Sequence, residues 1–147
     1  MTKLSQNNWT HTPAAEDFDA AVNYLSLLLP EDTVQRALQR LRHGPMVVRR
    51  AEDLLRASGL SELPSDNPTV AKQLKALKHG KLFSPVLCLR GDLHAGADMV
   101  IADGYHRVCA SYTLDEGADI PCRLAELPRP EETLAAAVVA TSRGADG

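Results

Sequence analysis

The sequence lacks the features of a secreted protein, of a membrane-spanning protein and of a protein stabilised by a structural metal ion. It has three cysteines, an odd number, with no Cys-x-x-Cys pair and no second Cys/His pair at zinc-ligand spacing. No apolar run approaches the roughly 20 residues that a membrane span needs. The polar start, residues 1–11, lacks the charged-then-apolar pattern of a signal peptide. We therefore expect one soluble domain in a reducing cytoplasm, with no membrane partner and no structural metal.

An excess of basic residues is also lacking. The chain has 16 Lys and Arg against 19 Asp and Glu, a formal net charge of −3. Affinity for nucleic acid comes chiefly from a surplus of positive charge, so this balance argues against a protein that coats DNA. The charge is nevertheless uneven, because residues 31–81 carry +4 and residues 82–147 carry −5. We expect an anionic ligand to be drawn to the middle of the chain.

The first 45 residues predict a pair of helices. Apolar residues at helical spacing predict one helix over 12–29, with Thr12 as its N-cap and Pro13 at its first position. The same spacing predicts a second helix over 31–43 that is closed by Gly44-Pro45. We interpret residues 1–45 as an N-terminal helical extension.

Residues 46–126 alternate between strand and helix patterns and predict an α/β (α+β) domain with a small mixed sheet. Gly59 ends a short helix, although one longer helix that includes the first strand is an alternative. Asn67 caps the next helix, Pro68 is its first residue and Gly80 marks its end. Strands are expected at 46–50, 85–89, 99–102 and 120–124, and helices at 51–57, 68–80 and 104–116. Residues 127–147 are a tail with room for one short helix.

The stretch from Asp103 to Arg107, in which an apolar strand meets a glycine and then a helix, carries the chemistry. The first helical turn has backbone N–H groups without intrahelical partners and the positive end of the helix dipole. Gly104 lets a ligand approach without meeting a Cβ. Arg107 adds a planar fork suited to phosphate oxygens, and His106 adds a donor that can exchange a proton. The pattern predicts a phosphate or carboxylate site.

A purely structural interpretation of the same residues stays open. Asp103 then caps the helix, Arg107 pairs with a carboxylate such as Asp115 and His106 is solvated. The placement of His and Arg beside a glycine at a strand end favours the ligand site instead.

The same residues resemble the signature of the ParB/sulfiredoxin superfamily. In that signature an arginine follows a glycine by three residues and a small residue follows three later, here Gly104, Arg107 and Ala110. The resemblance covers roughly residues 46–126 in matching order. Its other segments are Asp66-Asn67-Pro68 with the helix after it, the proline-led strand 84–89 and the last strand 120–124.

The resemblance implies a domain that binds a nucleotide, ATP or CTP, through the glycine-arginine turn and the helix after Asn67. The residues carried over for binding are Thr69, Lys72, Gly104, Tyr105, His106 and Arg107. Lysines also stand at 75, 78 and 81, three residues apart, and are interpreted as a solvated face. No metal ligand set is predicted, although Mg²⁺ would accompany a nucleotide.

Differences between this sequence and members of the family exclude some of the functions that the family includes. Sulfiredoxins look like Gly-Gly-Cys-His-Arg at this turn, and because Tyr105 takes the place of the cysteine, sulfinic-acid reduction is not expected. Partition proteins continue into a DNA-reading domain, whereas only about twenty residues follow the last strand here. Cys109 is interpreted as a buried apolar residue.

Three hypotheses remain. The first is a binding module for a nucleotide or another phosphorylated small molecule, in which the ligand changes how the N-terminal helices pack or pair in a homodimer. The second is a small phosphotransferase or NTP hydrolase of the same superfamily, in which Asp103 is the base or metal ligand and His106 polarises the transferred group. The third, a DNA-associated protein, is weakened by the net charge.

Overall fold

The computed structural model describes residues 8–128, which form five helices and a four-stranded mixed sheet. This confirms the predicted α+β class. The elements are α1 (Ala15–Leu25), α2 (Glu31–His43), β1 (Met46–Arg50), α3 (Ala51–Ser58), α4 (Pro68–Lys78), β2 (Val86–Arg90), β3 (Val100–Asp103), α5 (Tyr105–Leu114) and β4 (Asp119–Glu126). None of the described helices is long and apolar enough to cross a bilayer.

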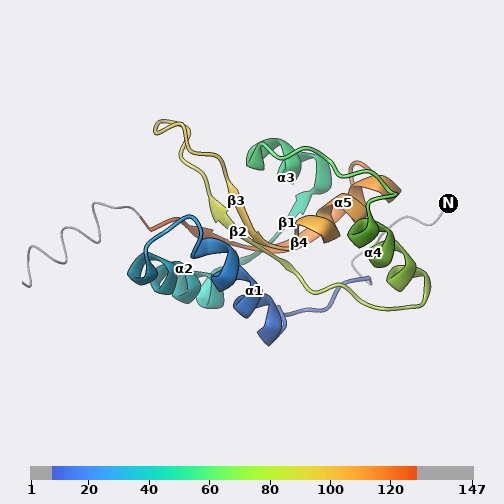
Figure 1. Ribbon diagram of the computed structural model, residues 1–147, viewed down its shortest axis with the longest axis horizontal. Coiled ribbons are helices and arrows are strands. Elements are labelled where there is room, and N and C mark those ends of the chain that lie inside the picture. Colours follow the sequence, from blue (N-terminus) through green and yellow to red (C-terminus); the bar gives the residue numbers. More distant parts are fainter. Residues whose placement is uncertain (1–7, 129–147) are drawn as a thin grey trace, which may run out of the picture.

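The strands lie in the order β1-β4-β2-β3 (Figure 1). β2 and β3 form the predicted hairpin, and β2 runs parallel to β4. β4 in turn pairs antiparallel with β1, so that the last strand inserts between the first and second strands. Because β2 lies inside the sheet with helices on both of its faces, its residues 86–89 are all buried.

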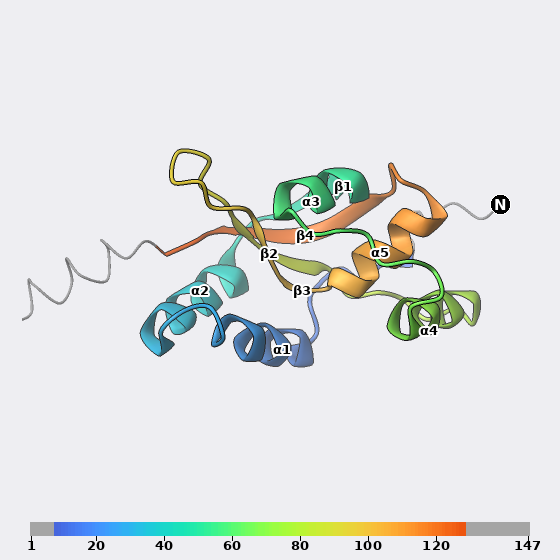
Figure 2. The ribbon, with the colours of Figure 1, turned by 45° about the horizontal axis from the view of Figure 1, so that its top comes forward.

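Helices cover both faces of the sheet, and Figure 2 shows α1 and α2 on one side with α3 and α5 on the other. Side chains that alternate along β2 divide between two cores. Val86 and Cys88 pack in one core with α3, α4 and α5, while Leu87 and Leu89 pack in the other with α1 and α2. The N-terminal helical pair therefore supplies seven of the eleven buried residues of this second core.

The predicted start of the first helix was wrong. The helix begins at Ala15, with Ala14 as its N-cap, and not at Thr12 or Pro13. The carboxylate of Asp17 accepts a hydrogen bond from the Ala14 N–H at 2.9 Å. Asp17, a residue inside the helix, therefore supplies the cap. The helix also ends earlier than predicted, at Leu25.

Two helix boundaries of the second half follow the predicted local signals. The Asn67 side chain accepts the N–H groups of Thr69 and Val70 at 3.0 and 3.2 Å, and Pro68 is the first residue of α4. Gly59 ends α3 in the left-handed conformation, with φ of 68°. The short helix predicted for the C-terminal tail lies outside the described residues beyond position 128.

Candidate functional site

Gly104 makes the turn from β3 into α5. Its φ is +109°, and no side chain caps the helix that follows it. A Cβ at this position would lie 2.9 Å from Val86 Cγ2 and 3.0 Å from Arg107 Nη2. The turn thus packs directly against β2, which only glycine permits in this conformation. The suggestion that Asp103 caps α5 was wrong.

The Arg107 guanidinium lies largely buried among three oxygens from three parts of the chain. Its Nη2 donates to Asp103 Oδ2 at 3.0 Å and to the Pro85 carbonyl at 3.1 Å. Its Nη1 lies 3.9 Å from Asp17 Oδ1, and its Nε is buried without a hydrogen-bond partner within residues 8–128. The arginine is therefore paired inside the protein, but with Asp103 and Asp17 and not with Asp115.

Two carboxylates consequently share one guanidinium. Burial raises the pKa of the Asp103 carboxyl, the charge and hydrogen bond of Arg107 oppose this shift, and Asp17 adds to it. A carboxyl with a raised pKa accepts and releases a proton at a higher pH than an exposed aspartate does. The Asp103 carboxyl is therefore suited to exchanging a proton at this point of the fold.

Sequence reasoning missed Asp17, although a signal was present. Asp17 stands on the same buried stripe of α1 as Ala21 and Leu25, four and eight residues later. A carboxylate on a buried stripe requires a partner. The pairing of Asp103 with Arg107, four residues apart, was also open to sequence reasoning.

A pocket of about 400 Å³ opens beside Arg107. It lies between the segment before α1, the first turn of α1, helix α4 and the connection from α4 to β2. Its wall combines hydroxyls, an amide and two basic groups with two carboxylates. The lining residues are Thr10, Thr12, Pro13, Ala14, Glu16, Asp17, Gln73, Lys81, Leu82, Phe83, Ser84 and Arg107.

The structure brings only part of the predicted site to this pocket. Arg107 lines it, and α4 contributes Gln73, the residue after Lys72. Thr69 and Lys72 are exposed and lie off the pocket wall. Lys81, interpreted from the sequence as part of a solvated face, does line it.

The remaining predicted residues lie around the start of α5. The Tyr105 hydroxyl donates to the Ser61 carbonyl, and burial raises the pKa of this phenol. Its ring lies 5.5 Å from that of His106, which is half-buried. Cys109 is buried and its sulfur accepts the Leu63 N–H at 3.5 Å. Because burial also raises the pKa of this thiol, Cys109 is suited to packing and not to nucleophilic attack.

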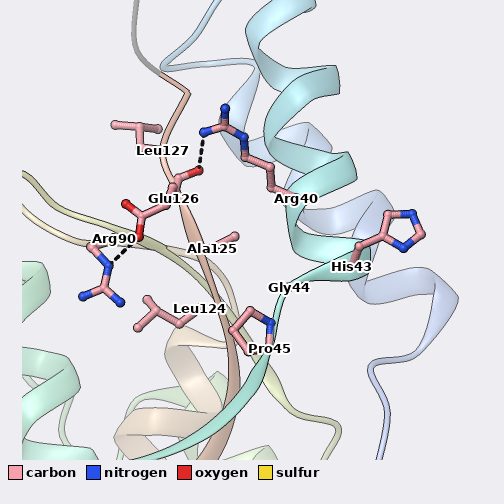
Figure 3. Close-up of a pocket in the computed structure, with 9 residues that line it drawn as sticks. All are labelled: Arg40, His43, Gly44, Pro45, Arg90, Leu124, Ala125, Glu126 and Leu127. Atoms are coloured by element: carbon pink, nitrogen blue, oxygen red, sulfur yellow. Dashed lines mark hydrogen bonds and ion pairs between the residues drawn. The ribbon is translucent and has the colours of Figure 1, made fainter.

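A larger hollow of about 690 Å³ lies at the other end of the sheet, between the end of α2 and the end of β4 (Figure 3). Arg40 and Arg90 lie on either side of Glu126: Arg40 donates to its carbonyl at 3.3 Å and Arg90 to its carboxylate at 2.8 Å. His43 points away from the strand. No predicted site residue lines this hollow, and its polar wall is dominated by an exposed ion pair.

Within residues 8–128, no group of three or more His, Cys, Asp or Glu side chains is placed to hold a metal ion. No protein-family model, curated protein or solved structure matches the chain. The fold and the geometry around Arg107 are therefore what the functional argument rests on.

Proposed function

We propose that this protein binds a nucleotide, or another small molecule with a phosphate group, in the pocket beside Arg107. The proposal rests on the meeting of Arg107, Lys81 and Ser84 on one pocket wall, to which α5 contributes the Arg107 side chain. Guanidinium, ammonium and hydroxyl groups are the donors that phosphate oxygens accept.

The size and composition of the pocket support a small ligand. A volume of about 400 Å³ is within the range of small-molecule sites, which is roughly 300–1,000 Å³. Thr10, Thr12 and Gln73 supply further polar groups for a sugar or base, and Leu82 and Phe83 supply apolar surface. The resemblance of the glycine-arginine turn to nucleotide-binding members of the ParB/sulfiredoxin superfamily supports the nucleotide in particular.

Lys81 offers the cleanest test of the pocket, because it is exposed and its replacement leaves the buried ion pairs intact. We expect Lys81→Glu to weaken nucleotide binding about tenfold, since a negative charge replaces a positive one beside the phosphate. The measurement is titration calorimetry, preceded by thermal-shift screening with ATP, CTP, GTP and ADP, with and without Mg²⁺, because a ligand of the folded state raises its stability.

Lys78→Glu is the matched control. Lys78 is also exposed, belongs to the end of α4 and does not line the pocket. We expect less than a twofold change in affinity for this variant. Equal weakening by both substitutions would show that only the general field of the protein attracts the anion, and the absence of binding by any nucleotide would contradict the proposed function.

A phosphotransferase or NTP hydrolase is the second candidate, and the observation that favours it is the second carboxylate, Asp17, close to Asp103. Because Asp103 does not line the pocket, its carboxylate would in this hypothesis accept the proton of the attacking hydroxyl or water through one bridging water, while Arg107 binds the phosphate. Mg²⁺ needs only one or two carboxylates beside substrate phosphates, and Asp17 lines the pocket in which those phosphates would lie; when bound, the ion would neutralise phosphate charge.

Asp103→Asn separates the two candidates. The amide keeps an oxygen that can accept from Arg107 but cannot take up a proton. If the protein is an enzyme, we expect the variant to retain nucleotide affinity within about threefold and to lose phosphate release or transfer at least about a hundredfold. Wild-type protein that binds ATP without turning it over would favour the binding module.

A further inference from the structure

We propose that the Asp17 carboxylate is an internal competitor for the phosphate site: it occupies the pocket side of the Arg107 guanidinium, and a ligand phosphate displaces it. This inference rests on the proposed function. It adds a regulation of the same site that couples ligand binding to the first turn of α1.

The three contacts of the Arg107 guanidinium are unequal. Asp103 and Pro85 accept hydrogen bonds of 3.0 and 3.1 Å from the same nitrogen, Nη2. Asp17 Oδ1 lies 3.9 Å from Nη1, which is beyond hydrogen-bond distance. Asp17 is therefore the loosest of the three partners, and a better acceptor that reaches Nη1 from the pocket replaces the weakest of these contacts.

The position of each carboxylate decides which of them a ligand meets. Asp17 and Arg107 both line the pocket, together with Lys81, whereas Asp103 does not line it. Asp103 thus holds the guanidinium from outside the pocket, and Asp17 approaches it from within. A phosphate that reaches Nη1 from the pocket enters the region where Asp17 now lies.

Displacement of Asp17 would change the hydrogen bonding at the N-terminus of α1. The second oxygen of this carboxylate, Oδ2, accepts the Ala14 N–H at 2.9 Å and closes the N-terminus of the helix. A ligand that draws Asp17 away from Arg107 changes this cap as well, and α1 packs on the sheet through Phe18, Ala21 and Leu25. Phosphate binding is therefore transmitted to the helix that covers one face of the protein.

Asp17→Asn tests the competitor directly, because asparagine loses the charge but keeps an oxygen that can cap Ala14. Glu16→Gln is the matched control: Glu16 lines the same pocket and carries the same charge, but it is exposed, and the carboxylates paired with Arg107 are Asp17 and Asp103 instead. We expect Asp17→Asn to bind inorganic pyrophosphate and ATP about tenfold more tightly than wild type, and Glu16→Gln less than twofold more tightly, by titration calorimetry.

A second readout separates competition from a general charge effect. In wild-type protein, saturation with pyrophosphate should shift the amide resonance of Ala14 and speed its hydrogen exchange, because its acceptor moves. If wild type binds but both variants gain affinity equally, or the Ala14 amide is unchanged by the ligand, the competitor role is wrong and the proposed function stands. If neither wild type nor Asp17→Asn binds either probe, the proposed function fails and this inference fails with it.

Discussion

Replacement of Arg107 by methionine is expected to lower the free energy of unfolding by about 3–5 kcal/mol. Methionine preserves much of the side-chain volume, but it leaves two carboxylates, Asp103 and Asp17, without the positive charge that compensates them. Their side chains are only 15% and 9% exposed, so water cannot replace the guanidinium. Removal of one partner of a buried ion pair costs this much because an uncompensated charge remains. Urea denaturation measures the change.

Arg90→Met is the control for this prediction. Arg90 forms an ion pair with Glu126 at 2.8 Å, but the two side chains are 56% and 67% exposed. An exposed pair of this kind contributes about 0–1 kcal/mol. The double variant Asp103→Asn with Arg107→Met should recover part of the loss, since one buried charge goes with its partner. A similar small effect for Arg107→Met and Arg90→Met would contradict the buried ion network.

The second large effect is expected for Gly104→Ala, which should destabilise the protein by about 2–4 kcal/mol. A φ of +109° is unfavourable for any residue with a Cβ. The new methyl group would also lie 2.9 Å from Val86 Cγ2 and 3.0 Å from Arg107 Nη2. Overpacking of this kind adds about 1–3 kcal/mol to the backbone cost. Thermal or urea unfolding measures the loss.

Gly80→Ala is the control that separates the backbone cost from the packing cost. Gly80 also has a positive φ, +82°, but no heavy atom lies within 4 Å of the Cβ that alanine would add. We expect a smaller cost of about 1–2 kcal/mol, from the backbone alone. Equal losses at the two glycines would show that the turn at Gly104 does not press against β2.

The elements that sequence predicted well are those decided by local chemistry. Asn67 caps α4 because its side chain reaches amides two and three residues away, and Gly59 ends α3 because only a residue without a Cβ adopts that conformation readily. Such signals require no knowledge of the rest of the chain. The hairpin of β2 and β3 was likewise predicted from a local pattern, two apolar runs on either side of a turn-rich connection.

The start of α1 was mispredicted because residue type was weighed without tertiary contacts. Thr12 and Pro13 are favourable residues for a helix start, but both lie on the pocket wall and the helix begins only at Ala15. Asp17 serves at once as the cap of this helix and as a neighbour of Arg107. Local rules assign one role to a residue, whereas packing here gives it two.

The candidate site was predicted in part, and for the same reason. The glycine and arginine of the turn are close in sequence and were found together. Asp17, Lys81 and Ser84 join Arg107 only because α1 and the connection before β2 pack against the start of α5. The buried stripe of α1 indicates that Asp17 needs a partner, but the sequence does not indicate that this partner is Arg107 or that Lys81 and Ser84 lie beside it.

The most direct test of the phosphate site is a titration of ¹⁵N-labelled wild-type protein with ATP, followed amide by amide. We expect saturable shifts that are largest for Ser84, Lys81 and Arg107, with smaller shifts at Ala14 and Asp17. Shifts centred instead on Arg40 and Arg90 would move the site to the hollow at the other end of the sheet. The absence of any saturable shift would show that the pocket beside Arg107 does not bind a phosphate ligand.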